Sequence, residues 1–289
     1  MFTVGGTVYG WTDIAEFARL HGDWDEIAAQ AAAGMAAVQQ ATPPQDAVDD
    51  AARAFRHEWR LLSGDDLAAW LDRREVSMDG WLAYVARSLV REERVAAAAE
   101  RATDEEVWVE AMCSGRLDDC AETLARLLAV APGVALAALD DAFEDFCRTV
   151  TTEKAIEREI VAGRLDWIRV RYAAALFSTE AAAAEAALCV RDDGLAFTDV
   201  ARTAGVAATE HEVWLEDADP ALAPFLVAAR ESELVGPAAT DRGFLLAEVR
   251  EKMQVSADDS AVRARAEQAV IERAADRAAT DHVVWHEQL

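Results

Sequence analysis

Residues 231–249 read ESELVGPAATDRGFLLAEV, a turn signal at Gly236–Pro237 followed by the strand-like run 243–249. Another β-prone stretch lies upstream at 167–177, and a short strand-like run occupies 212–215. Helical patterns fill the intervals at 179–191 and 197–204, and a further helix is expected to open at Asp219–Pro220. This order of strands and helices, within some 85 residues, predicts a compact α/β domain.

The flanking segments read differently. The first ~165 residues predict a short strand followed by a helical bundle, with a capping box at Thr103–Glu106. One long helix is expected from about Asp258 to Glu287, and its apolar face needs a partner. We therefore predict a mostly helical α+β chain with a helical lobe at 1–165, an inserted α/β domain at 166–255, and a C-terminal helix at 256–289 that packs on the helical lobe.

The charge balance limits the partners. The 289 residues include 54 Asp and Glu against 28 Lys and Arg, a formal net charge of −26. Such a charge repels phosphate backbones and anionic lipid surfaces, so neither nucleic acid nor a membrane is expected as a partner. The acidity is compatible with compositional bias, with salt adaptation or with a docking surface. The N-terminus lacks the basic and apolar regions of a secretory signal, which leads us to expect a cytoplasmic protein.

Motifs for common chemistries are missing. There is no G-x-S-x-G elbow, no phosphate-binding G-x-x-x-x-G-K-[ST] and no G-x-G-x-x-G after a strand. The four cysteines show no zinc-ligand spacing and are expected to be free. His282 and His286 are spaced to share a metal with Glu287, but a solvent-exposed helix end explains them as well. We expect no metal and no cofactor.

Three segments together resemble a parvulin-type peptidyl-prolyl isomerase domain. Residues 231–249 are similar to its final turn and strand, 170–183 (VRYAAALFSTEAAA) to its opening strand and helix, and 197–202 (FTDVAR) to its second helix. The N-terminal VGGTVYGWT at 4–12 resembles the opening of SurA-like chaperones, in which a helical lobe and a C-terminal helix surround a parvulin domain. The resemblance therefore implies peptide binding and accounts for the whole chain.

The departures from that family concern its active site. The resemblance places the two histidines of the family's groove on Ala174 and Leu245, and the Met and Phe that floor its proline pocket near Ala218 and Leu222. Isomerisation requires a pocket that lowers a barrier of ~18–20 kcal/mol, and these aliphatic side chains cannot form hydrogen bonds. We therefore expect a protein that binds a peptide without isomerising it.

Three interpretations of function follow from these residues. The first is a non-catalytic peptide-binding chaperone or accessory protein, by analogy for maturation of a ribosomally made peptide together with a peptide-modifying enzyme. Its expected peptide contacts are the following side chains: Trp214, Leu222, Phe225, Phe244, Leu245 and His211. The alternative is a residual isomerase or a peptide-modifying enzyme that uses Glu210, His211 and Glu212, since two carboxylates favour the cationic form of a histidine between them. A purely structural interaction module is a third possibility.

Overall fold

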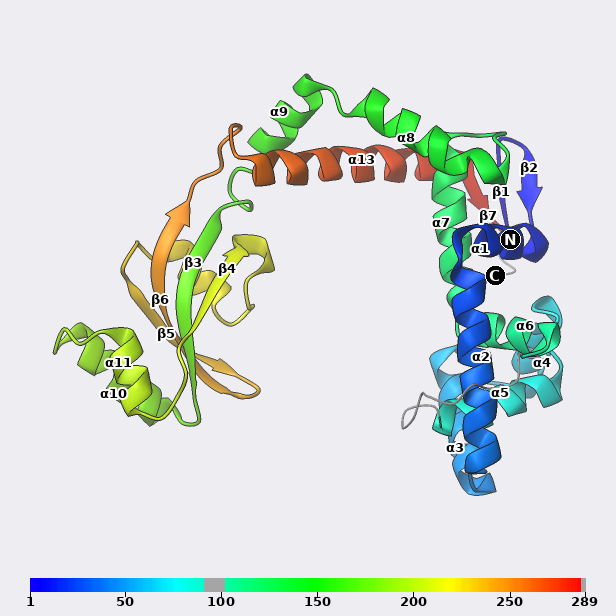
Figure 1. Ribbon diagram of the computed structural model, residues 1–289, viewed down its shortest axis with the longest axis horizontal. Coiled ribbons are helices and arrows are strands. Elements are labelled where there is room, and N and C mark those ends of the chain that lie inside the picture. The colour runs from blue at the N-terminus through cyan, green and yellow to red at the C-terminus, as the bar shows by residue number, and fades with distance from the viewer. Residues whose placement is uncertain (91–101, 287–289) are drawn as a thin grey trace. The chain divides into compact units, whose positions relative to one another are not determined.

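The computed structural model describes residues 1–90 and 102–286 and confirms a mostly helical α+β chain (Figure 1). It divides into two compact units: the helical unit, Met1–Thr149 with Arg273–Leu289, and the α+β unit, Val150–Glu272. These boundaries differ from the expected 165 and 255, and the long C-terminal helix contributes residues to both units. None of the helices in the described ranges is both long and apolar enough to cross a membrane.

The helical unit is built from short helices after an N-terminal hairpin. Its elements are β1 (Phe2–Val4), β2 (Thr7–Tyr9), α1 (Trp11–His21), α2 (Asp23–Gln40), α3 (Gln45–Glu58), α4 (Gly64–Arg73), α5 (Met78–Val90), α6 (Asp104–Cys113), α7 (Arg116–Val130), the 3-10 turn Leu136–Ala138, α8 (Leu139–Val150), the end of α13 (Ser260–His282) and β7 (Val283–Trp285). The expected capping box is confirmed, because Thr103 Oγ1 accepts from the backbone N–H of Glu106 and the Glu106 carboxylate accepts from the backbone N–H of Thr103.

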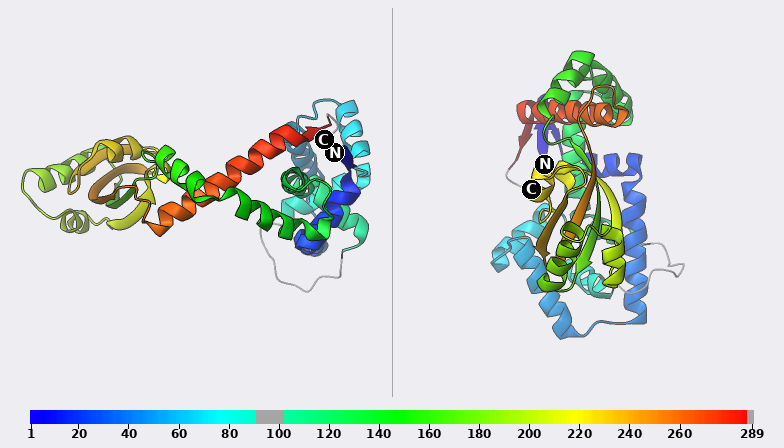
Figure 2. Two further views of the ribbon diagram at one scale, coloured as in Figure 1. Left: turned by 90° about the horizontal axis from the view of Figure 1, so that it is seen from above. Right: turned by 90° about the vertical axis from the view of Figure 1, so that its left-hand side faces the viewer.

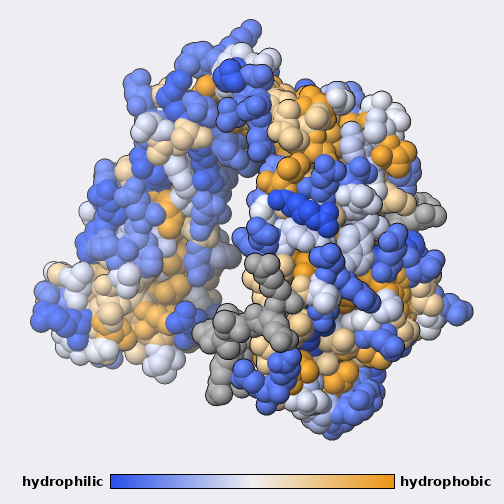
Figure 3. Space-filling model, turned by 45° about the vertical axis from the view of Figure 1, so that its right-hand side comes forward, coloured by the Kyte–Doolittle hydropathy of each residue, from blue (hydrophilic) through white to orange (hydrophobic). Residues whose placement is uncertain are grey.

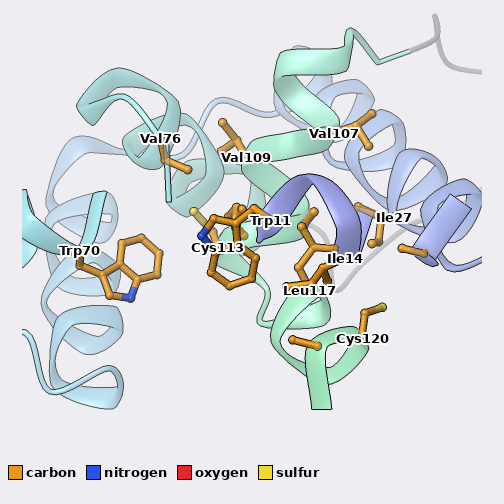
Figure 4. Packing of buried hydrophobic residues seen from close by; sticks show 14 of the residues in the cluster. Trp11, Ile14, Ile27, Trp70, Val76, Val107, Val109, Cys113, Leu117 and Cys120 are labelled. Atoms are coloured by element: carbon orange, nitrogen blue, oxygen red, sulfur yellow. The ribbon is translucent and has the colours of Figure 1, made fainter. Parts of the chain in front are cut away.

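Tryptophans make up much of the core of this unit. Trp11 and Trp70 lie in the cluster drawn in Figure 4, and Trp81 is buried in the same core. Arg74, only 3% exposed, lies among the rings of Trp11, Trp59 and Trp70 at 5.2, 4.9 and 4.7 Å. Trp11, Trp70 and Trp81 are therefore core residues, and the rings of Trp11, Trp59 and Trp70 surround the Arg74 guanidinium.

A three-stranded antiparallel sheet, in the order β2-β1-β7, joins the two ends of the chain. Phe2 is fully buried and pairs with Tyr9 on one side and Trp285 on the other, at ring distances of 5.3 and 5.2 Å. The strand β7 was not expected, because the sequence suggested that the helix continues to Glu287. The helix instead ends at His282, and Glu287 lies outside the described residues.

The α+β unit contains a four-stranded antiparallel sheet in the order β4-β3-β6-β5. Its elements are α9 (Glu153–Ala162), β3 (Arg169–Phe177), α10 (Glu180–Arg191), α11 (Phe197–Thr203), β4 (Thr209–Trp214), the 3-10 turn Leu215–Asp217, α12 (Ala223–Ala228), β5 (Leu234–Thr240), β6 (Gly243–Met253) and the first part of α13. The right-hand view of Figure 2 looks toward this unit. The order of elements is the expected one.

Two local expectations in this unit are corrected. Gly236–Pro237 lies inside β5, at a register shift between Val235 and Ala238, and the chain turns only between Thr240 and Gly243. Pro237 has no backbone N–H to donate to the neighbouring strand, and the register shift lets it lie in β5 without breaking a ladder hydrogen bond. The helix expected to open at Asp219–Pro220 begins at Ala223. The residues before it form a turn in which the Asp219 carboxylate accepts a hydrogen bond from the backbone N–H of Ala221.

A separate apolar cluster explains why α9 and the start of α13 belong to the α+β unit. Val262 and Ala266 of α13 pack with Ile156, Ile160 and Trp167. The Arg263 guanidinium donates to both carboxylate oxygens of Glu153 at 2.9 and 2.8 Å. The expectation that the C-terminal helix packs only on the helical lobe therefore differs from the structure.

Candidate functional site

Successive side chains of a strand point to opposite faces of the four-stranded sheet, and helices cover both faces. On β3, Tyr172 and Ala174 point to the face covered by α12, whereas Ala173, Ala175 and Phe177 point to the face covered by α10 and α11. We call these the α12 face and the α10/α11 face. Hydrophilic residues cover much of the molecular surface seen in Figure 3, with apolar residues between them.

The positions that the resemblance assigns to histidines lie on the α12 face. Ala174 on β3 and Leu245 on β6 belong to one apolar cluster with Leu222, and Ala218 lies in it too. Ala174 and Leu222 are buried, while Leu245 is half-buried. These side chains offer no hydrogen-bonding group to a twisted peptide bond.

The polar groups of the α12 face lie toward the edge strand β4. The imidazole of His211 stacks on the buried ring of Tyr172, with centroids 5.1 Å apart and an interplanar angle of 24°. Burial raises the pKa of the Tyr172 phenol, and the nearby Asp219 carboxylate raises that pKa further. His211 itself is exposed.

The three clustered residues of the enzyme alternative do not converge. Strand alternation places His211 opposite Tyr172 on the α12 face, but it places Glu210 and Glu212 opposite Ala173 and Arg171 on the other face. Glu212 accepts from Arg169 at 3.3 Å and from Arg171 at 3.2 Å. The two carboxylates therefore serve ion pairs across the sheet and do not flank the imidazole.

The expected peptide contacts are only partly brought together. Leu222, Leu245 and His211 share the α12 face, and Phe225 projects from α12 with 44% of its surface exposed. Phe244 packs instead with the α10/α11 face, because it neighbours Leu245 on one strand.

Trp214 lies at a different place in the unit. It packs with the cluster of α9 and α13, and the guanidinium groups of Arg169 and Arg265 lie over its ring at 5.3 and 5.0 Å. These partners come from β3 and from α13, and Arg265 of α13 lies about 50 residues further along the chain, which no local pattern at 209–215 indicates.

Sequence reasoning missed two features of the α12 face. One is the stack of His211 on Tyr172, which requires the pairing register of β3 and β4. The other is Leu176, half-buried on β3 directly opposite Leu245 on β6. The period-2 pattern of 170–176 was the signal that could have placed Leu176 with Tyr172 and Ala174.

Metal ligands do not gather in the described residues, where no group of three or more His, Cys, Asp or Glu side chains could hold an ion. His286 follows β7, and its Nε2 lies 2.7 Å from the Thr3 hydroxyl oxygen, whereas His282 ends α13. A hollow of about 520 Å³ in the helical unit is lined by Phe17, His21, Asp23, Arg116, Cys120 and Asp140, among others. Its charges are already partly paired, since Arg116 binds Glu26 and His21 contacts Asp140.

Comparison with known proteins returned only solved structures. No family model and no curated protein matches the chain. The peptidylprolyl isomerase PrsA from Bacillus cereus is similar at 12% identity and a TM-score of 0.33, over 96% of this chain and 88% of that one. PrsA from Bacillus subtilis is similar at 13% identity and a TM-score of 0.25, over 65% of this chain and 92% of that one. Values this low describe a similarity and support no conclusion about activity.

Proposed function

We propose that the α+β unit binds an extended peptide segment on its α12 face without isomerising it. The observation that carries the proposal is the partly exposed pair Leu176 and Leu245 on the α12 face, four residues along β3 from Tyr172, the cross-strand partner of His211. An aliphatic floor of this kind holds apolar side chains through buried area, at ~25 cal/mol per Å². The imidazole at its rim supplies a polar contact for the peptide backbone.

The proposal extends to the biological role that the sequence resemblance implies. The peptide is an unfolded segment or a ribosomally made precursor, held by this chain for a separate peptide-modifying enzyme. That role rests on the resemblance of residues 166–252 to the parvulin family and on the aliphatic replacements at Ala174 and Leu245.

Peptide binding is tested with a fluorescently labelled six-residue peptide that contains a central leucine–proline pair. We expect Leu245→Ala and His211→Ala each to weaken binding by at least about threefold, since each removes a contact worth ~0.7 kcal/mol or more. The control is Leu62→Ala, which shortens a leucine that is 78% exposed in the helical unit. Fluorescence anisotropy measures the dissociation constants, and equal affinities for Leu245→Ala, His211→Ala and the unchanged protein would contradict the proposal.

Isomerisation is tested separately on a proline peptide. We expect the full chain to leave the rate of cis/trans exchange at its uncatalysed value, on a timescale of roughly tens to hundreds of seconds, because Ala174 and Leu245 cannot form hydrogen bonds to the substrate. A protease-coupled assay or NMR exchange spectroscopy measures this rate. An acceleration that scales with protein concentration would show that the chain is an isomerase.

The alternative enzyme has one specific observation in its favour. The stack brings a phenol and an imidazole together, with Asp219 near Tyr172, and these are residue types that general acid–base catalysis uses. If isomerisation is accelerated, Tyr172→Phe and His211→Ala distinguish this alternative, since both should then abolish the acceleration. Glu210 and Glu212 take no part in this alternative, because they lie on the other face of the sheet.

A further inference from the structure

A pocket of about 430 Å³ opens between α10 and α11, on the side of the unit opposite to the α12 face. Its apolar lining comes from the following residues: Ala182, Ala186, Cys189, Leu195, Val200 and Ala204. The backbone N–H of Leu195 donates to the carbonyl of Cys189 at 3.2 Å, and both residues line the pocket. The volume lies within the range that accommodates a small ligand or one or two large side chains.

The mouth of this pocket carries exposed apolar surface. Leu195, which lines the pocket, is 52% exposed. The pocket exists because Ala182 and Ala186, one turn apart on α10, are too small to fill the space against α11. An exposed leucine beside an unfilled apolar hollow favours an aliphatic occupant.

The charges at the pocket have one sign. Its charged lining residues are Glu185 and Asp199, and the exposed Asp192 and Asp193 follow directly after α10. Asp199 is paired with Arg202 at 2.5 Å, whereas Glu185 makes no ion pair with any residue that the structure describes. Arg191 is not available to neutralise Glu185, because its guanidinium donates to the carbonyl of Leu234 at 2.9 Å.

We infer that this pocket binds a peptide segment in which an aliphatic side chain is followed by a cationic one, as in a leucine next to a lysine. The aliphatic side chain enters the hollow between α10 and α11, and the cation pairs with Glu185. Because the two sites lie on opposite faces of the sheet, this inference does not depend on the proposed function of the α12 face.

Two synthetic peptides test the inference with the full chain. The two peptides have the same length and the same leucine positions. Every remaining position is lysine in the first peptide and glutamate in the second. The readout is alkylation of Cys189, followed by mass spectrometry of the digested protein. Cys147, also half-buried, serves as an internal control, and burial raises the pKa of Cys113 to about 12 and that of Cys120 to about 11, which keeps both thiols unreactive.

We expect the leucine–lysine peptide to slow alkylation of Cys189 and to leave Cys147 unchanged, while the leucine–glutamate peptide slows neither. Glu185→Gln should weaken the protection about two- to fivefold, the range of one exposed ion pair. Glu185→Lys should weaken it further. His211→Ala should have no effect, which separates this site from the α12 face.

The matched control is Glu157→Lys, which makes the same charge change at an exposed position of α9. Equal loss of protection in Glu157→Lys and Glu185→Lys would show only a general attraction of the acidic protein for cations and would overturn the inference. Protection by the leucine–glutamate peptide would overturn it too, as would full protection in Glu185→Lys. A thermal melt confirms folding of each variant, and Glu185→Gln serves if Glu185→Lys does not fold.

Discussion

Replacing Arg74 with alanine is expected to lower the free energy of unfolding of the helical unit by about 3 kcal/mol, because it breaks an ion pair whose cation is buried and whose carboxylate is half-buried. The Arg74 guanidinium donates to both carboxylate oxygens of Asp118 at 3.0 Å and to the carbonyl of Met112 at 3.3 Å. Its removal leaves Asp118 without its partner and opens a cavity among three indole rings. Urea unfolding followed by tryptophan fluorescence measures the change.

Two further variants separate the causes of that loss. Arg74→Lys keeps the charge but loses the planar fork that reaches both oxygens of Asp118, so we expect an intermediate effect. In the double variant with Asp118→Asn, the cost of the unpaired carboxylate disappears, and the double-mutant cycle gives the coupling energy. Arg53→Ala, at an exposed i, i+3 pair with Asp50, is the surface control. A loss below about 1 kcal/mol for Arg74→Ala would place Arg74 with ordinary surface ion pairs.

Truncating the chain after Glu272 is expected to destabilise the helical unit by at least about 3 kcal/mol and to leave the α+β unit nearly unchanged. The truncation removes β7, exposes the buried Phe2 ring, and breaks the ion pair of Arg126 with Asp276 at 2.6 Å. Loss of the contacts around one buried aromatic residue costs about this much. Hydrogen exchange resolved by segment measures the opening free energy of each unit.

A longer truncation, after Val255, should extend the loss to the α+β unit. It removes Val262 and Ala266 from the apolar cluster around Trp167 and breaks the ion pair between Arg263 and Glu153. Exchange in residues 156–170 should then accelerate in this truncation but not in the one after Glu272. If both truncations affected the same amides equally, the division of α13 between the two units would be wrong.

Local sequence determined much of this protein. Runs of β-prone apolar residues marked the strands around 170–177 and 243–249, and the Thr103–Glu106 capping box marked the start of α6, because both signals act between residues a few positions apart. The same local information predicted the helices at 180–191 and 197–203 within a residue or two. The mostly helical α+β class followed from these elements.

Tertiary structure alone decided which side chains meet. Period-2 alternation predicts that Phe244 and Leu245 face opposite ways, but it does not say which face α12 will cover. Trp214 was expected to contact a peptide on the sheet face. Its ring instead packs with Arg169, Arg265 and the apolar face of α13. Pairings between residues tens of positions apart are fixed by the packing of the whole unit, so the site had to be assembled from the register of β3 with β4 and β6 and could not be obtained from the motifs themselves.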